Sequence, residues 1–295
     1  MIPEPLAGPT TLRLLWPQWQ GAGRDMVASL IPGVPLEQAR RGYVMGTTVL
    51  SAILPPHDGP TATVPVSFDD DDTHRDGIDS KSAVVTQLAA ALAVIAEHDA
   101  DRIVTFGGEC SVSVAPFAAL AAKYGDDLAV VWVDSHPDIG TPASQYPGYH
   151  AMAVSVLLGH GDAEIVDLLP ATVAASHVAL TGLHSWTDDD IPNAAEWGLS
   201  TFSPNALRDS SQPLQDWLSA TGCRRVAIHL DVDVVDCNEE VLGLGAEPDG
   251  LTSTQVRRLI DDISGAAGVV GFTIAEYIPR QVMAMQRLAA GMPLL

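Results

Sequence analysis

The stretch LAVVWVDSHPD, residues 128–138, joins a strand pattern to a row of candidate metal ligands. Its first six residues are apolar and rich in valine, which is typical of a strand that is buried on both faces of a parallel sheet. Asp134, His136 and Asp138 follow at alternate positions, so their side chains point the same way in an extended segment. Carboxylates and an imidazole together suit Mn²⁺, Fe²⁺, Co²⁺ or Zn²⁺. The stretch therefore predicts a divalent metal site just beyond a strand end.

A second stretch, RVAIHLDVDVVD at residues 225–236, has the same organisation. Asp231 and Asp233 end an apolar run and lie on one side of it. Asp236 follows three residues later and has two possible roles, as a metal ligand or as a brace that accepts backbone N–H groups. Carboxylates gathered in one crevice repel one another unless cations neutralise them. The two stretches are therefore interpreted as two halves of one site for metal-assisted hydrolysis.

Apolar runs with strand character alternate with helical patterns along the rest of the chain. The other predicted strands are residues 103–106, 178–180, 226–230 and 269–274. The predicted helices are residues 82–97, 116–124 and 252–263. Ser80 or Ser82 is available to cap the first helix, and the last begins with the Ser/Thr-rich sequence of an N-cap. This βαβα alternation predicts an α/β fold with a doubly wound, mainly parallel sheet, which places ligand sites at the C-terminal ends of its strands.

The remaining features of the chain predict its organisation and surroundings. Residues 55–76, which hold the acidic run 69–72, are predicted to form a loop. No repeat or clear linker divides the 295 residues, so one domain over residues 1–295 is expected. Three widely spaced cysteines do not form a disulfide framework, the N-terminus does not resemble a signal peptide, and no apolar run is long enough to span a membrane. These features predict a cytoplasmic protein.

The charge of the chain restricts its partners. The formal net charge is −22 at pH 7. This charge argues against nucleic acid or an anionic membrane as a partner, because both carry negative charge themselves. A small cationic substrate such as a guanidinium or an amine would suit it.

Seven short motifs, in fixed order over residues 102–280, carry a resemblance to a known family. They read Gly107-Gly108-Glu109-Cys110, Asp134-Ser135-His136-Pro137-Asp138, Ile139-Gly140-Thr141-Pro142, His150-Ala151-Met152-Ala153, Asp231-Val232-Asp233-Val234-Val235-Asp236, Gly250-Leu251-Thr252 and Glu276-Tyr277-Ile278-Pro279. In these motifs the chain resembles the ureohydrolase (arginase/agmatinase) family. The resemblance implies a three-layer α/β/α arginase-like fold. It also implies a hydrolase that cleaves a guanidino C–N bond of arginine or an arginine-like compound and releases urea or a urea derivative.

The resemblance further implies a site with two Mn²⁺ ions. Asp134 and Asp231 would be shared by the two ions. Asp138 would bind the first ion, and His136 and Asp233 would bind the second. A small cationic guanidino compound would be the substrate, and the protein would form a homo-oligomer, as many family members do.

The same resemblance implies a catalytic set made of His150, Glu276 and Asp138. Glu276 would face the guanidinium group, and His150 would act as a proton shuttle or substrate contact. Taken without the resemblance, His150 could be a structural loop histidine and Glu276 the ion-pair partner of Arg280.

Three departures from the family pattern leave the metal and the substrate open. Cys110 stands where most relatives have a metal-binding histidine; it would either bind the first metal as a thiolate, favouring Zn²⁺, Fe²⁺ or Co²⁺, or be a small buried residue that leaves one ion weakly held. Gly140 replaces an asparagine, and residues 182–186 lose an acidic pattern for which one of residues 188–190 could substitute. The alternatives are an Nω-hydroxy-arginine hydrolase that releases hydroxyurea, a zinc-dependent deacetylase-like amidohydrolase, and a catalytically silent family member.

Overall fold

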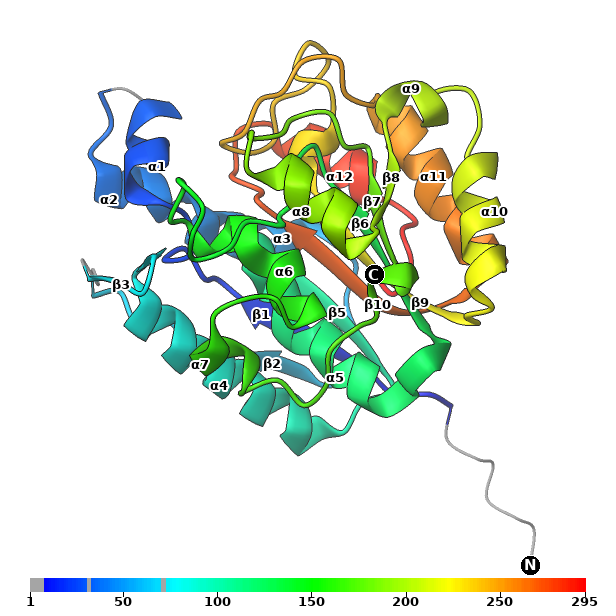
Figure 1. Cartoon of the computed structure of the whole chain (residues 1–295), viewed down its shortest axis with the longest axis horizontal. Helices are drawn as coiled ribbons and strands as arrows, with labels where there is room; N and C mark the ends of the chain where they lie inside the picture. The colour runs from blue at the N-terminus through cyan, green and yellow to red at the C-terminus, as the bar shows by residue number, and fades with distance from the viewer. Residues whose placement is uncertain (1–7, 31–32, 70–72) are drawn as a thin grey trace, which may run out of the picture.

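The structure, a computed structural model, describes residues 8–30, 33–69 and 73–295. At the centre of this part of the chain lies an eight-stranded sheet in which neighbouring strands run parallel (Figure 1). From edge to edge the strands are β2 (Thr61–Thr63), β1 (Thr11–Trp16), β5 (Arg102–Gly107), β10 (Gly268–Ala275), β9 (Arg225–Asp231), β6 (Leu128–Val133), β7 (Val178–Thr181) and β8 (Ser200–Phe202). A separate antiparallel pair joins β3 (His74–Arg75) to β4 (Ile78–Asp79).

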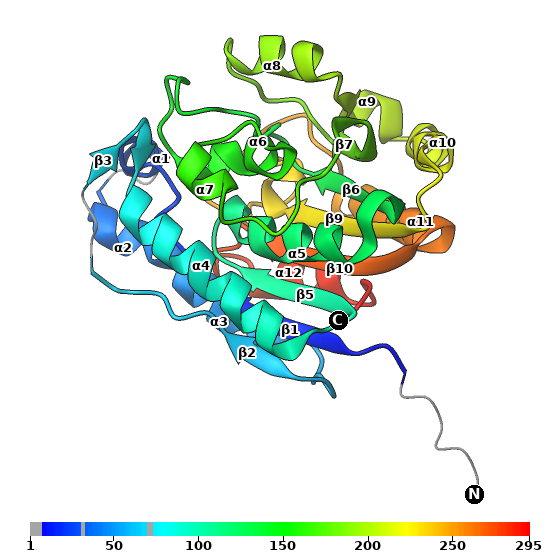
Figure 2. The same cartoon turned by 60° about the horizontal axis from the view of Figure 1, so that its bottom comes forward.

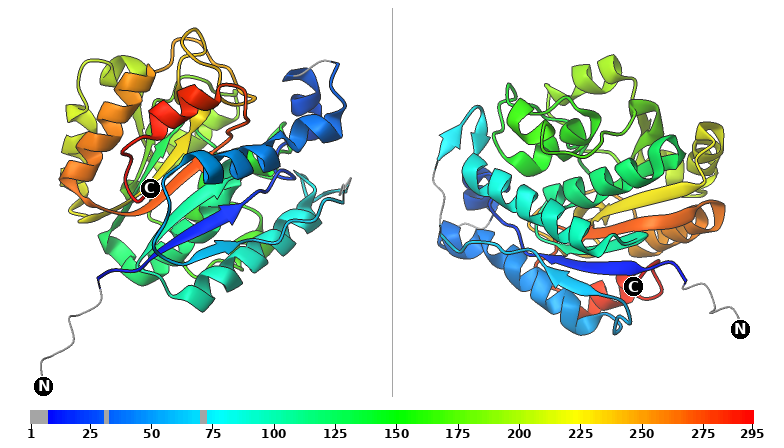
Figure 3. Two further views of the ribbon diagram at one scale, coloured as in Figure 1. Left: turned by 180° about the vertical axis from the view of Figure 1, so that it is seen from behind. Right: turned by 90° about the horizontal axis from the view of Figure 1, so that it is seen from below.

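Helices cover both faces of the sheet. The helices on one face are α4 (Lys81–His98), α5 (Val114–Tyr124), α6 (Ala153–Leu158), α7 (Ala163–Val166) and α8 (Asp190–Trp197). Those on the other face are α3 (Gly42–Ile53), α9 (Pro204–Leu207), α10 (Gln212–Thr221), α11 (Ser253–Ala266) and α12 (Val282–Ala289). Figure 2 shows α4 and α5 over the first face, and the left view of Figure 3 looks onto α3, α11 and α12 on the second. The predicted three-layer α/β/α fold with a mainly parallel sheet is confirmed.

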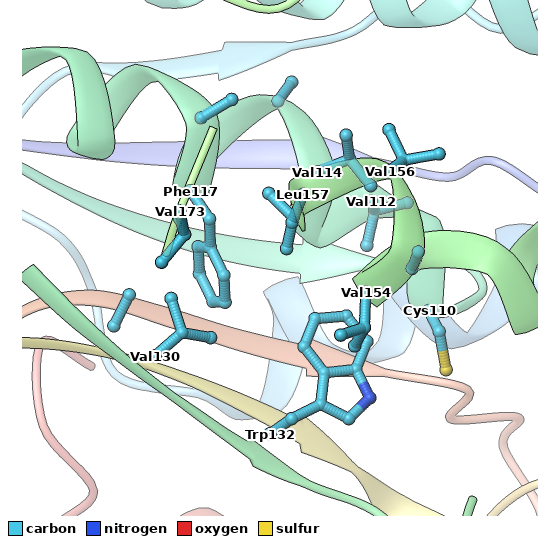
Figure 4. Close-up of a cluster of buried hydrophobic side chains, with 14 of the residues drawn as sticks. Cys110, Val112, Val114, Phe117, Val130, Trp132, Val154, Val156, Leu157 and Val173 are labelled. Atoms are coloured by element: carbon cyan, nitrogen blue, oxygen red, sulfur yellow. The ribbon is translucent and has the colours of Figure 1, made fainter. Parts of the chain in front are cut away.

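The strand β6 shows how the sequence builds these layers. Its side chains alternate between the two faces, so that Leu128, Val130 and Trp132 enter the core under α5 and α6. Ala129, Val131 and Val133 enter the core under α11 and α10. Burying a side chain of valine or leucine size stabilises the fold by about 1.5–3 kcal/mol, so an apolar residue is favoured at every position of such a strand. Figure 4 shows the first of these cores, with Trp132 beside Phe117 and Val154.

The predicted elements agree with the structure to within a few residues. All five predicted strands and all three predicted helices are present, as β5, β6, β7, β9, β10, α4, α5 and α11. Thr252 caps α11 in a capping box with Gln255, as the Ser/Thr-rich start indicated. The proposed cap of α4 is wrong, because Ser80 occupies the N-cap in a left-handed conformation and makes no side-chain capping bond.

The prediction for residues 55–76 is wrong in part. Residues 70–72 lie outside the described residues, but the remainder contains β2 and β3. β2 is a three-residue edge strand of alternating exposure that pairs with β1. So short and exposed a strand carries little hydrophobic signal, and its pairing partner fixes its conformation. β1 itself was not predicted, and it extends the sheet beyond β5.

Four neighbouring strands at the centre of the sheet, β5, β10, β9 and β6, bring their C-terminal ends to one edge. The Gly-Gly turn after β5 allows the chain to pass close to the segment that follows β1. A Cβ atom on Gly108 would lie 1.6 Å from the carbonyl oxygen of Gln18, so a side chain does not fit there. Among the described residues, no helix is both long and apolar enough to cross a membrane.

Candidate metal centre and substrate pocket

The candidate site residues follow the ends of the four central strands. Cys110 follows β5, Asp134 follows β6, Asp231 ends β9 and Glu276 follows β10. In the sheet register Ala275 lies opposite Asp231, and Val133 lies opposite Leu230, so these strands end level with one another. Residues from four distant parts of the sequence therefore meet at one edge.

A pocket of about 290 Å³ opens over these strand ends. Of the eight residues assigned to the metal ions or to catalysis, only Asp134 does not line it, and Asp134 is buried, with 1% of its surface exposed. The lining includes the exposed apolar side chains of Met26 and Leu30, from α1 (Arg24–Leu30), and of Trp186. No lysine or arginine is among the described lining residues. The pocket therefore combines acidic groups with an apolar mouth.

One part of the acidic cluster, here called the second half, consists of Asp134, His136 and Asp233. His136 Nδ1 lies 3.2 Å from Asp233 Oδ2 and 3.6 Å from Asp134 Oδ1. Ser135 Oγ donates to Asp233 Oδ1 at 2.6 Å, and the His136 N–H donates to Asp134 Oδ1 at 2.6 Å. Glu247 lies 3.9 Å from the other ring nitrogen of His136. The motif of residues 134–138 thus supplies both metal ligands and the hydrogen-bond donors that orient the carboxylates.

The other part, here called the first half, consists of Cys110, Asp134, Asp138 and His229. The potential ligand atoms of these four residues all lie within 4.8 Å of one another, and all four side chains are buried. Cys110 Sγ lies 3.9 Å from Asp134 Oδ2 and 3.0 Å from Asp231 Oδ2. Figure 4 shows Cys110 at the edge of the core, with its sulfur turned away from Val112 and Val156. Asp134 thus presents one oxygen to each half.

The electrostatics of the cluster favour a bound cation. Burial, together with the neighbouring carboxylates, raises the pKa of Asp134 to about 6 and the pKa values of Asp138 and Asp231 well above the usual range. Asp138 Oδ2 is buried and accepts no hydrogen bond among the described residues. Buried carboxylates that repel one another in this way are the donors that divalent ions bind, so the residues present fit the two metal ions that the sequence resemblance implies.

Burial affects the pKa values of three other groups in the cluster in different ways. Burial acts to raise the pKa of Asp233, but His136 and the donors on Ser135 overcome it and hold the value at about 2. Burial lowers the pKa of His229 to about 3, which keeps its imidazole neutral. Burial and four acidic neighbours raise the pKa of the Cys110 thiol well above its usual value.

A hydrogen-bonded chain crosses the pocket beside the acidic cluster. Glu276 Oε1 lies 3.0 Å from His150 Nδ1, and Tyr146 Oη lies 2.6 Å from His150 Nε2. Glu276 Oε1 also accepts the backbone N–H of Cys110 at 3.2 Å. Among the described residues Glu276 has no ion pair with Arg280, and His150 lies in the pocket with the acids. Burial works against protonation of His150, but Glu276 outweighs it and raises the pKa of the imidazole.

Two of the site carboxylates lie on strained backbone. Asp138 has a φ of 50° and Glu276 a φ of 61°, in the left-handed region that residues with side chains rarely adopt. Each such residue costs of the order of 1–3 kcal/mol and persists only where surrounding contacts hold it. Here Glu276 donates its N–H to Gly108 O at 2.7 Å, and Asp138 O accepts from Val154 N at 3.0 Å. The surrounding contacts thus hold both carboxylates in position at a cost in folding stability.

The structure also places the residues whose role was left open. Asp236 accepts the backbone and side-chain N–H groups of Asn238, both at 2.9 Å, and so braces its loop. Asp189 and Asp190 line the pocket, and Asp189 accepts the backbone N–H of Gln145. Gly140 lies close to Ala151, whose carbonyl oxygen would be 2.9 Å from a Cβ atom at position 140. No side chain therefore fills the place of the family's asparagine.

The Arginase family model matches residues 30–292, which is most of the chain. The chain belongs to the arginase family. Membership confirms the predicted resemblance and the enzyme class, a ureohydrolase acting on C–N bonds of linear amidines. The arginase of Bacillus subtilis (strain 168) is 27% identical over 277 residues, which cover 86% of this chain and 90% of that protein.

Two solved structures show the same fold. An Entamoeba histolytica arginase in complex with L-ornithine superposes with a TM-score of 0.75 at 15% identity, covering 96% of this chain and 97% of the other. A proclavaminate amidino hydrolase from Streptomyces clavuligerus gives a TM-score of 0.65 at 18% identity, covering 97% and 90%. The arginase-like architecture is thereby confirmed, at identities too low to carry over a substrate.

Three pocket residues and one residue of the acidic cluster, His229, were missed by the sequence interpretation. Tyr43, Tyr146 and Glu247 come from segments without a metal motif, so no local signal marks them. His229 is different, because His229, Asp231 and Asp233 stand at alternate positions, in the same spacing as the first motif. That spacing was the signal that could have identified it.

Proposed function

We propose that this arginase-family ureohydrolase hydrolyses the guanidino C–N bond of arginine or an arginine-like compound and releases urea or a urea derivative. One observation carries the proposal. Four adjacent strand ends gather the carboxylates of both aspartate motifs, the imidazole of His136 and the Glu276–His150 pair around one pocket. A cluster of this kind has a function only if cations and a cationic substrate offset its charge.

Two Mn²⁺ ions are the proposed cofactors. Asp134 and Asp231 would be shared by both ions, Asp138 and Cys110 would bind the first, and His136 and Asp233 would bind the second. When bound, the ions would supply the Lewis-acid chemistry that activates water for hydrolysis near neutral pH. The protein holds the ligands in place by the hydrogen bonds of Ser135 and of the backbone around Asp134.

The pocket selects a cation by its charge. Glu276 lines it at 5% exposure and would pair with the guanidinium group, orienting the carbon toward the metal-binding acids. Asp189 lies in the same lining, and its hydrogen bonds from Thr187 and Gln145 lower its pKa, so it would carry a charge toward the amine end of a substrate. Burial strengthens the charge interaction at Glu276.

His150 would deliver the proton that the departing amine needs. Its two ring nitrogens contact Glu276 and Tyr146, so the ring is held at both ends. The carboxylate of Glu276 favours the protonated imidazole, which is the form that donates a proton. Tyr146 is itself fixed by accepting the backbone N–H of Gly23 at 2.9 Å. The chain thus holds a proton donor beside the guanidinium-binding carboxylate.

Nω-hydroxy-arginine is the second candidate substrate, with hydroxyurea as the product. The pocket has no side chain at Gly140, and the segment 182–186, which lacks the family's acidic pattern, places Trp186 in the lining. Neither change replaces a proposed metal ligand. They would alter which end group is accepted and leave the hydrolytic chemistry in place.

A substrate panel tests the proposal. The protein loaded with Mn²⁺ is incubated with arginine, agmatine, Nω-hydroxy-arginine and other guanidino compounds, and release of urea or hydroxyurea is measured. Turnover of at least one compound, and its loss in Glu276→Gln, is the expected result. An acetylated lysine peptide with Zn²⁺ serves as the deacetylase control. Failure of every guanidino compound, by a protein that binds metal, would contradict the proposed activity and favour a catalytically silent member.

A further inference from the structure

His229 is a buried imidazole whose neighbours on the adjacent strands are Trp132 and Thr273. It lies in the middle of β9, directly opposite Trp132 in the register with β6. Its ring stacks on that of Trp132 with a centroid distance of 3.6 Å and an interplanar angle of 7°. None of its surface is exposed. An apolar residue would fill this place at lower cost, so the imidazole calls for an explanation.

The two ring nitrogens of His229 have different surroundings. Nδ1 lies 2.8 Å from the hydroxyl of Ser113, which can accept the proton of Nδ1 and leave the lone pair of Nε2 free. Nε2 is buried and has no hydrogen-bond partner among the described residues. It lies 3.8 Å from Asp134 Oδ2, on the side of the ring that faces the first half of the acidic cluster.

We propose that His229 Nε2 is a ligand of the first metal ion, supplying the nitrogen that Cys110 does not. The inference depends on the proposed metal centre. Its geometric basis is that ligand atoms about 2.1 Å from a common ion can be no more than about 4.2 Å apart. The separation from Asp134 Oδ2 lies within this limit, as does the 3.9 Å between Asp134 Oδ2 and Cys110 Sγ, for which the limit is longer.

The surroundings of His229 match those of metal-binding histidines elsewhere. Such a histidine donates its second ring N–H to an acceptor, which fixes its tautomer and orientation. Ser113 provides that acceptor, and the stacked indole of Trp132 fixes the ring plane. The first ion would then have one sulfur, one nitrogen and oxygens of Asp134, Asp138 and the shared Asp231 as ligands. This donor set is softer than that of the second half, so the first position would accept Zn²⁺ or Co²⁺ in place of Mn²⁺ more readily than the second.

The competing explanation is that His229 is only a core residue whose Nε2 reaches Asp134 through a water molecule. Both explanations predict that the ring is buried and stacked. They differ in whether metal binding needs the nitrogen, so the test measures metal binding and not activity.

Metal binding to four proteins separates the two explanations. Wild type, His229→Phe, Asp233→Asn and His160→Phe are stripped with a chelator and titrated with Co²⁺ by calorimetry, and bound metal per chain is counted. His229→Phe keeps an aromatic ring on Trp132 but removes the nitrogen. His160 is the matched control, because its exposed ring stacks on Trp197 at 4.3 Å and 5°, and it belongs to none of the ligand groups.

The expected result is that wild type and His160→Phe bind two ions per chain. His229→Phe should bind the second ion normally and the first ion more than tenfold more weakly. Asp233→Asn should instead lose the second ion. Ser113→Ala should weaken the same ion as His229→Phe by about tenfold, the usual effect of removing such an acceptor. Two equally tight ions in His229→Phe, as in wild type, would overturn the role of His229 and leave the proposed function intact. Wild type without metal would overturn the proposed function itself.

A measurement on the wild type alone covers the case in which His229→Phe does not fold. X-ray absorption of the protein with two bound Co²⁺ ions counts the imidazole and sulfur neighbours of the metal. Two imidazoles per pair of ions, from His136 and His229, are expected, together with one sulfur. A single imidazole would overturn the proposal.

Discussion

The first and second halves of the acidic cluster share Asp134 but are built in different ways. The second half comes from two motifs, and neighbouring residues such as Ser135 hydrogen-bond its carboxylates directly. The first half is assembled from the ends of β5 and β6, the loop before α6 and one residue within β9. It contains a thiol, and a carboxylate oxygen and an imidazole nitrogen that have no hydrogen-bond partner among the described residues. The comparison teaches that the motifs mark every ligand of the second half, whereas in the first half they mark Cys110, Asp134 and Asp138 and only the fold brings His229 to them.

The largest effect is expected from Asp134→Asn, because this residue faces both halves. The substitution removes the shared charge and should lower metal content at both positions and reduce turnover by at least about a thousandfold. Metal counts and steady-state urea release measure the two effects. Asp236→Asn is the control, since Asp236 only braces its loop. Loss of one ion alone would show that the halves bind independently, contrary to a shared ligand.

The stability of the fold should also vary with pH in different ways in the metal-free and the metal-loaded protein. The pKa of Asp134 is raised to about 6 in the folded protein, above the value near 3.9 of an unfolded chain. Its protonated form therefore stabilises the metal-free fold fully below about pH 4, and this contribution is lost as pH rises through about 6. Metal binding needs the ionised form, so affinity should fall about tenfold for each pH unit below 6.

Thermal unfolding with and without Mn²⁺ between pH 5 and 8 measures this difference. The rise in midpoint caused by the metal should be small at pH 5 and increase through pH 6, and the raised pKa values of Asp138 and Asp231 extend the increase to higher pH. A metal effect of equal size at every pH would show that these carboxylates are already ionised without the ion.

The substitution Cys110→His tests whether residue 110 binds the first ion. The thiol has a raised pKa and must lose its proton to bind, whereas an imidazole binds in its neutral form. The substitution should tighten binding of the first ion about tenfold, in the range reported for changes around metal ligands. Metal per chain and calorimetric affinity are the readouts, with Cys223→Ser as the control outside the cluster. An unchanged first site would indicate that Cys110 is a packing residue.

The smallest effect is expected from Tyr146→Phe, which touches neither half. It removes the hydroxyl that contacts His150 and accepts the N–H of Gly23, and it leaves the ring in place. A hydrogen bond of this kind contributes about 1 kcal/mol, so kcat should fall about fivefold while metal content stays the same. Tyr124→Phe is the matched control, because Tyr124 donates to Asp101 O away from the pocket. A change in metal content would mean that Tyr146 supports the cluster and not His150.

The fold could be predicted where apolar runs fill both faces of the sheet. β6 and β9 are apolar along their lengths because both sides are covered, and their limits were found closely. β1 and β2 were not predicted. β2 is three residues long and exposed, and only its pairing with β1 makes it a strand. The single domain, the cytoplasmic location and the homo-oligomer stay predictions.

The site could be predicted where ligands stand two residues apart. Asp134, His136 and Asp233 lie together as their spacing indicated, and the family motifs placed Cys110 and Glu276 beside them. His229 was overlooked because it lies within an apolar strand, where a single histidine reads as core. Tyr146 could not be found, since its contact with His150 depends on how a loop folds over the pocket.

The position of α1 bears on how proteins of this kind acquire new substrates. Met26 and Leu30 of this helix help form the pocket mouth, at the point where the match to the family model begins, residue 30. The contact surface for the far end of a substrate is therefore drawn in part from a helix that carries none of the metal motifs. Exchange of α1 between related chains should transfer preference for one end group over another, with the hydrolytic machinery untouched. A change of substrate specificity would then need only a few substitutions in α1.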